Sequence, residues 1–263
     1  MRGQNRKGGG PVWSIVRLGP PKLKPVPPDV LAMAGAWATL LDFTVAGLLL
    51  AIVVDAFAPP QDLPWKPLRL DQPVGMATAV KFSRAAADPV LCRKVLTEGG
   101  VSFLEEPDRN RGDCATENTV RVRDGTAVAL APAGPVVTCP VALGYAFWSR
   151  HVVQPAARTE LGEPVIRTEH YGSYACRNIY GRSEGRRSEH AFANALDVAA
   201  FRTASGRRIS VVNDFRDEGP RGRFLRQVRD GGCRWFRAVL SPDYNAAHRD
   251  HFHLDFGRYG VCR

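Results

Sequence analysis

The sequence predicts an α+β domain preceded by one long apolar helix. After residue 74, helical periodicity and short strand-like runs follow one another irregularly. Residues 251–256 (HFHLDF) alternate strictly between polar and apolar side chains, which is typical of a strand. The nearly uninterrupted apolar run over residues 30–58 predicts the preceding helix. A length of 263 residues and a hydrophobic content of 44% suit one substantial domain and exclude disorder throughout.

Residues 1–29 are basic and rich in Gly and Pro, so we expect a flexible tail. The run over 30–58 exceeds the roughly 20 residues that span a bilayer. Asp42 opposes insertion by about 2.5–3.5 kcal/mol, but ten Leu, Ile, Val and Phe residues contribute about 0.3–0.6 kcal/mol each in its favour. The basic flank then predicts a single pass with a cytoplasmic N-terminus and an exported C-terminal domain.

The segment 56–58 (AFA) resembles a signal-peptide cleavage site, but Pro59 follows it and the apolar run is long for a signal peptide. We therefore favour an uncleaved anchor over a cleaved signal. The Pro-rich residues 59–73 predict an extended spacer, and the folded domain is expected over residues 74–263.

Within the domain, periodicity predicts helices at residues 89–99, 141–153, 224–228 and 235–240. Strands are predicted at residues 120–122, 127–130, 165–171, 195–201, 209–212 and 251–256.

The net charge and the cysteines limit the classes of function and the cellular compartment. A net charge of +10 favours an anionic partner, but no nucleic-acid-binding motif is present and we expect none to be bound. Six dispersed cysteines without a C-x-x-C pair indicate three disulfides in an oxidising compartment; buried free thiols are the alternative. The order of the six cysteines in the sequence leaves 15 disulfide connectivities open. Our working prediction is the sequential set, Cys92–Cys114, Cys139–Cys176 and Cys233–Cys262.

Two short segments carry candidate metal ligands. His190 and Asp197 stand seven positions apart, and a second segment ends in His251-Phe252-His253. In a strand, residues two apart share a face, so His251 and His253 can point into one cleft. Two imidazoles and a carboxylate, with one position open, form the ligand set of a catalytic zinc site.

These motifs resemble the LAS metallopeptidases (lysostaphin, D-Ala-D-Ala peptidases, sonic hedgehog), which share H-x6-D followed by H-x-H. The form S-E-H-x-x-G-x-A-x-D is matched from Ser188 to Asp197, except at Ala193, where that family usually has Gly. Further segments make residues 74–263 similar to the bacterial extensin-like C-terminal domain: 139–140, 153–157, 171–177, 243–248 and 250–253. The resemblance implies a hedgehog/DD-peptidase-like fold, with a small antiparallel sheet that carries the H-x-H strand and helices on one side.

The resemblance also implies residue roles. Zinc would be held by His190, Asp197 and His253. His251 would assist proton transfer; His248 and Asp250 are rival candidates for the general base. Arg177 and Ser188 occupy positions where related carboxypeptidases contact substrate.

The function implied is a periplasmic zinc peptidase, anchored in a bacterial inner membrane, that cuts peptidoglycan as a D,D-carboxypeptidase or a D,D-endopeptidase. The alternative is a non-catalytic, zinc-stabilised wall-binding or scaffold domain. The sequence leaves the exact bond, the partner proteins and the oligomeric state open.

Overall fold

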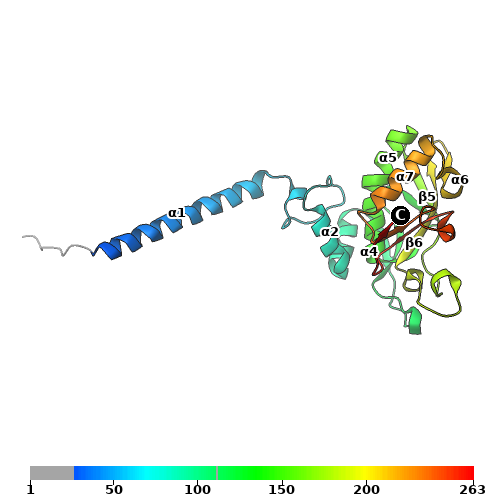
Figure 1. Ribbon diagram of the computed structural model, residues 1–263, viewed down its shortest axis with the longest axis horizontal. Coiled ribbons are helices and arrows are strands. Elements are labelled where there is room, and N and C mark those ends of the chain that lie inside the picture. Colours follow the sequence, from blue (N-terminus) through cyan, green and yellow to red (C-terminus); the bar gives the residue numbers. More distant parts are fainter. Residues whose placement is uncertain (1–26, 111) are drawn as a thin grey trace, which may run out of the picture. The chain divides into compact units, whose positions relative to one another are not determined.

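The computed structural model describes residues 27–110 and 112–263, and the chain divides into two units, with the boundary between Phe57 and Ala58. Most of the basic tail expected over 1–29 lies outside the described residues. The first unit contains helix α1, Pro28–Phe57, whose 30 residues extend about 45 Å at 1.5 Å per residue (Figure 1). This helix is long and apolar enough to be a membrane span or a signal sequence.

The second unit, Ala58–Arg263, is an α+β domain with two sheets. In the described part of the chain, seven strands form the large sheet in the order β10-β8-β9-β6-β5-β3, with β7 paired to β6. Its strands are β3 (Ala129–Ala131), β5 (Val165–Gly172), β6 (Ala195–Thr203), β7 (Arg208–Ser210), β8 (Ala238–Leu240), β9 (Phe252–Asp255) and β10 (Val261–Cys262). Pairing is antiparallel except at β3–β5 and β8–β10, so the sheet is mixed and not purely antiparallel.

The small sheet is antiparallel, with strand order β1-β2-β4. It consists of β1 (Ser102–Glu105), β2 (Thr119–Asp124) and β4 (Val136–Thr138). Around the two sheets lie helices α2 (Thr78–Ala87), α3 (Pro89–Glu98), α4 (Cys139–Trp148), α5 (Gln154–Ala156), α6 (Val211–Asp214) and α7 (Pro220–Gly232). The turns between and after α4 and α5 are π-helical, so the helical path continues to Leu161.

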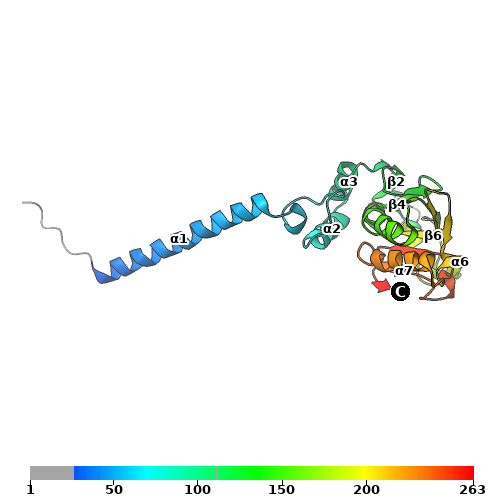
Figure 2. The same ribbon diagram turned by 90° about the horizontal axis from the view of Figure 1, so that it is seen from above.

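Helices α4 and α7 lie beside one another and pack on one face of the large sheet (Figures 1 and 2). Trp148 of α4 contacts Phe201 of β6 at 5.9 Å between ring centroids, and Phe201 contacts Phe224 of α7 at 5.1 Å. The Trp148 indole N–H donates to the Val228 carbonyl at 2.8 Å, which satisfies a buried donor and joins the two helices. Helix α4 is buried on nearly every side, which explains its almost continuous apolar sequence.

Residues 59–73 differ from the expected extended spacer. Leu63, Leu68 and Leu70 are buried, and the ammonium group of the buried Lys81 donates to the Pro60 carbonyl at 2.8 Å. Pro60 begins a 3₁₀-helix, Pro60–Asp62, turns follow it, and the leucines between the prolines are buried in the domain. This segment is therefore part of the folded unit.

Two secondary-structure predictions were wrong. Residues 235–240, expected to be helical, contain strand β8, because Ala238–Leu240 pair with β9 and β10 and long-range pairing overrides the local apolar spacing. Residues 209–212, expected to be a strand, are split between the end of β7 and the start of α6.

Three disulfides are present, but two of the sequential pairs were wrong. The bonds are Cys92–Cys139, Cys114–Cys176 and Cys233–Cys262, with Cα–Cα distances of 6.2, 5.6 and 5.9 Å. Cys92 belongs to α3, which packs on α4, and α4 begins at Cys139. Packing of elements distant in sequence thus decided the pairing, and only Cys233–Cys262 is confirmed.

Candidate metal centre

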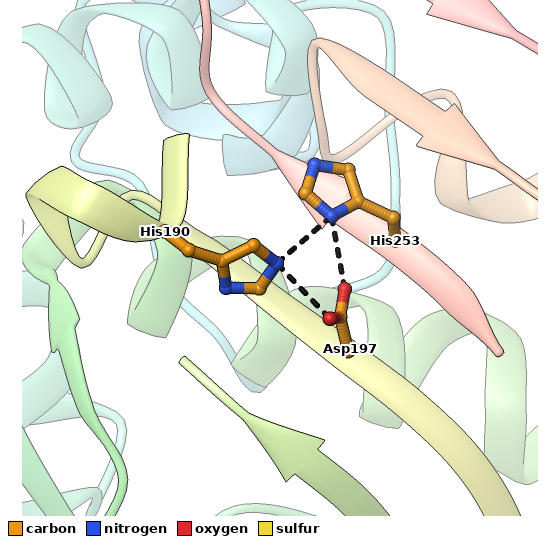
Figure 3. Close-up of side chains that lie close together, drawn as sticks. All are labelled: His190, Asp197 and His253. Atoms are coloured by element: carbon orange, nitrogen blue, oxygen red, sulfur yellow. Dashed lines mark hydrogen bonds and ion pairs between the residues drawn. The ribbon is translucent and has the colours of Figure 1, made fainter. Parts of the chain in front are cut away.

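Two neighbouring strands of the large sheet, β6 and β9, and the short helix before β6 bring the candidate ligands together. Asp197 of β6 and His253 of β9 are direct partners in the antiparallel ladder, so their side chains leave the same face of the sheet. His190 lies in the 3₁₀-helix Glu189–Phe192, which immediately precedes β6 and turns the imidazole toward them (Figure 3). The three side chains are buried, with exposed fractions of 3% for His190, 9% for Asp197 and 8% for His253.

The facing atoms are spaced for one small cation. Nε2 of His190 lies 3.1 Å from Nδ1 of His253 and 3.0 Å from Oδ2 of Asp197, and Nδ1 of His253 lies 2.9 Å from Oδ1 of Asp197 (Figure 3). One potential ligand atom from each of the three residues lies within 4.8 Å of the other two. Ligand atoms around a tetrahedral zinc with bonds of about 2.1 Å are separated by about 3.4 Å, so a small outward shift accommodates the ion.

The remaining ring nitrogens fix the histidine tautomers. Nδ1 of His190 donates to the Ser173 carbonyl at 3.2 Å, and Nε2 of His253 donates to Oδ2 of Asp255 at 2.9 Å. Each imidazole therefore presents an unprotonated nitrogen to Asp197 when neutral. Three electron-pair donors facing one another repel, and a shared proton or a metal ion relieves that repulsion. Hydrogen bonding of the second ring nitrogen is also the usual arrangement for metal-binding histidines.

The pKa shifts of Asp197 and His253 indicate that a proton is shared within the metal-free cluster. Burial opposes ionisation of Asp197, but hydrogen bonds and charge from His190 and His253 outweigh it and lower the carboxyl pKa below its usual range. Burial also opposes protonation of His253, yet its hydrogen bonds to Asp197 and Asp255 raise its pKa to about 9. Without metal, a proton on His253 therefore neutralises the cluster.

The other histidines of the second motif line the same cleft. Nδ1 of His251 lies 2.9 Å from Oδ1 of Asp250, while its Nε2 lies 3.5 Å from Oδ1 of Asp197. His251 thus faces the cluster, and Asp250 orients it from the far side. His248 lies against His251, with ring centroids 5.3 Å apart.

His248 is held by a side chain from its own turn. Its Nδ1 lies 2.7 Å from the Asn245 side-chain oxygen, and the Asn245 amide donates to the Tyr180 hydroxyl at 2.9 Å. Burial, together with the positive charges of His253 and His251, lowers the pKa of His248 to about 4. His248 is therefore neutral at pH 7 and able to accept a proton.

The segment before β6 is tied down by its own polar side chains. The Ser188 hydroxyl accepts from the His190 backbone N–H at 3.4 Å and so caps the 3₁₀-helix. The Glu189 carboxylate accepts from the Asn194 side chain at 2.8 Å. Ala193, which replaces the expected Gly, has φ = 54°, a left-handed conformation that disfavours a Cβ by about 1–2 kcal/mol. Ala193 therefore adopts the backbone geometry that suits Gly.

A cleft of about 460 Å³ opens over the cluster. Arg177, Ser188 and His248 are among its lining residues, together with Arg186 and Arg187. Arg187 pairs with Asp113 at 3.4 Å, and the Arg186 guanidinium lies 4.6 Å from the Tyr259 ring centroid. The described residues provide no acceptor for the exposed Arg177 guanidinium, which leaves it available to an anion in the cleft. Asp250 does not line the cleft; it contacts His251 instead.

Two functional contacts were missed from the sequence. Asp255 is two positions after His253 in a strictly alternating strand, so its shared face with His251 and His253 could have been read from the pattern. The Ser173 carbonyl could not, because a backbone group leaves no trace in residue identity.

Fold and site together define an α+β protein with a buried two-histidine, one-carboxylate cluster at the floor of a cleft. Residues 90–263 match the family Extensin-like protein C-terminus, and the chain belongs to that family. Searches of curated proteins and of solved structures returned no match.

Proposed function

We propose that this protein is a zinc-dependent peptidase that cuts D-amino-acid peptide bonds in peptidoglycan stems or cross-links. The observation that carries the proposal is the convergence of His190, Asp197 and His253 within 4.8 Å at the floor of a cleft. Three ligands with an open side are typical of catalytic zinc, whereas structural zinc is enclosed by four protein ligands. The H-x6-D and H-x-H motifs, and their resemblance to LAS metallopeptidases, support the same class and a hedgehog/DD-peptidase-like fold.

Zinc held by these three residues would polarise the peptide carbonyl and activate a water molecule. His251 faces the cluster through Nε2 and is oriented through Nδ1 by Asp250, an arrangement suited to receiving and returning a proton. His248, adjacent to His251 and without a carboxylate partner among the described residues, is the second candidate. Because Asp250 contacts His251, we assign it an orienting role.

The cleft suits a substrate with a free carboxylate. Arg177 presents an exposed guanidinium at the cleft, and guanidinium groups bind carboxylates through two parallel hydrogen bonds. Stem peptides of peptidoglycan end in a carboxylate, which supports the carboxypeptidase activity. Endopeptidase activity on a cross-link is the second form of the same proposal.

The proposed location is the periplasmic face of a bacterial inner membrane. Helix α1 would be a single-pass anchor with the basic N-terminus in the cytoplasm, in accordance with the positive-inside rule. Three disulfides in the following domain favour an oxidising compartment.

The test is mass spectrometry of purified muropeptides incubated with the zinc-loaded, oxidised protein, with and without chelator. Release of D-Ala or of uncrosslinked stems, abolished by chelator and restored by zinc, would support the proposal. A zinc-loaded protein that releases no product from any muropeptide would refute it. The scaffold alternative, in which the metal only stabilises a wall-binding domain, would then be adopted.

A further inference from the structure

We propose that three arginines in register on the large sheet form a second anion-binding subsite, which holds an acidic peptide strand leading into the metal cleft. The subsite consists of Arg167 of β5, Arg202 of β6 and Arg208 of β7, and we call it the arginine row. This inference rests on the proposed function, because it describes how a peptide substrate extends beyond the metal cluster.

The strand register places the three guanidinium groups side by side. Arg167 pairs with Arg202 across β5 and β6, and Arg202 pairs with Arg208 across β6 and β7. Neighbouring strands are about 4.8 Å apart, so three like charges lie within about 10 Å. Like charges directly opposite on a sheet are destabilising, and no requirement of packing explains an exposed row of them.

One carboxylate is shared by two members of the row. Glu169 accepts from Nε of Arg202 and from Nε of Arg208, both at 2.7 Å. Among the described residues, no acceptor contacts the terminal nitrogens of Arg202 and Arg208, and none contacts Arg167. Three positive charges against one negative charge leave the row at +2, with outward-facing N–H groups arranged to bind further carboxylates.

The arginine row is on the same face of the sheet as the metal cluster. On β6, Leu196, Val198 and Phe201 belong to the hydrophobic core. A register shift that skips Ala199 reverses the alternation between Val198 and Phe201, so Asp197 and Arg202 both lie on the opposite face. A surface hollow of about 410 Å³ is lined by all three arginines and by Tyr171. Tyr171 in turn contacts His251 edge-on, with ring centroids 5.8 Å apart.

The path from the row to the cleft is the length of a short peptide. Arg167 and Tyr171 are four residues apart on β5, which corresponds to about 13 Å. An extended peptide covers that distance with about four residues. Its carboxylates would contact the arginines, while its backbone would pass Tyr171 toward His251. A nucleic acid is less suited, because among the described residues Tyr171 is the one Phe, Tyr or Trp side chain that lines the hollow.

The test measures binding without catalysis. Full-length protein in detergent is stripped of metal with chelator and titrated against fluorescein-labelled hexa-D-glutamate by anisotropy. We expect Arg167→Gln to weaken binding about 5-fold or more, and Arg167→Gln/Arg208→Gln to weaken it by tens of fold, because each fork contributes charge-assisted hydrogen bonds. The matched control is Arg123→Gln, which removes an exposed arginine on β2 of the other sheet and should leave binding unchanged.

Circular dichroism establishes that each variant is folded before its affinity is compared. The proposal is overturned if Arg167→Gln and Arg123→Gln bind the peptide equally, or if a labelled DNA hexamer binds more tightly than the peptide. It is also overturned if the metal-stripped protein binds none of the peptide. Failure of muropeptide cleavage would contradict the proposed function and leave this binding result unaffected.

Discussion

Asp255 accepts a hydrogen bond from Nε2 of His253 at 2.9 Å, and this contact turns Nδ1 of His253 toward Asp197. Its other oxygen accepts from the Gly257 backbone N–H at 2.7 Å, so the carboxylate is fixed in orientation. Asp255 thereby sets the tautomer of one proposed ligand without touching the metal position.

The first prediction concerns this contact. Asp255→Asn preserves size but weakens the acceptor, so zinc affinity should fall by about 10–100-fold, as is typical for loss of an outer hydrogen-bond partner. Competition titration with a chromophoric chelator measures it. Asp250→Asn, which alters the partner of His251, is the control and should retain wild-type affinity. Equal affinity of all three proteins would remove Asp255 from the site.

The second prediction separates ligands from proton-transfer groups. His190→Ala and Asp197→Ala should lose both bound zinc and peptidase activity, because each removes one of three proposed ligands. His248→Ala should keep its zinc. Metal content by mass spectrometry and product release by chromatography distinguish the classes, and a His190→Ala protein with full zinc content would contradict the ligand assignment.

The third prediction ranks the candidates for the base. His251→Ala should reduce turnover by about 10²–10⁴-fold with zinc retained, because His251 faces Asp197 at 3.5 Å. Asp250→Asn should have a smaller effect, since it only orients His251. If Asp250→Asn alone abolishes turnover, the carboxypeptidase-like base is correct; if only His248→Ala does, His248 is the base.

The fourth prediction is a pH dependence of the metal-free protein. The pKa of His253 is raised to about 9, above its unfolded value of about 6.5, so its contribution to stability is complete below about pH 6.5 and is lost as pH rises through 9. The pKa of Asp197 is lowered, so its contribution is present above about pH 4 and is lost as pH falls toward its folded pKa.

Thermal unfolding in chelator should therefore show a melting temperature that decreases between pH 6.5 and 9. Zinc competes with the proton on His253, so the stabilisation by added zinc should increase over the same range. A melting temperature of the chelated protein that rises from pH 6.5 to 9 would contradict the assigned protonation.

The fifth prediction tests the disulfides. Peptide mapping without reductant should recover Cys92 linked to Cys139 and Cys114 linked to Cys176, not the sequential pairs. The bridge Cys92–Cys139 closes a separation of 47 residues, and chain entropy then predicts a loss of about 4 kcal/mol in the free energy of unfolding for Cys92→Ala/Cys139→Ala. Denaturant unfolding of the wild-type protein and of this double variant measures the difference in the free energy of unfolding.

The local pattern predicted both strands that carry candidate ligands, at residues 195–201 and 251–256. In 251–256 the prediction followed from strict alternation, which depends only on which face each side chain takes. It failed at residues 235–240, where apolar spacing suited a helix but pairing with β9 decided for a strand. It also failed for residues 59–73, because composition does not show that Leu63, Leu68 and Leu70 have a surface to pack on.

The sequence by itself determined the apolar helix α1, the α+β class, the six cysteines and the candidate ligands His190, Asp197 and His253, since these depend on residue type and short spacing. Only the tertiary structure decided which cysteines pair, that Asp250 contacts His251, and that Arg167, Arg202 and Arg208 lie in one row. The disulfide pairs and the arginine row depend on strand register or helix packing between segments far apart in the chain, where a shift of one residue exchanges the two faces of a strand. The Asp250 contact joins two sequence neighbours, whose side-chain directions are set by the fold.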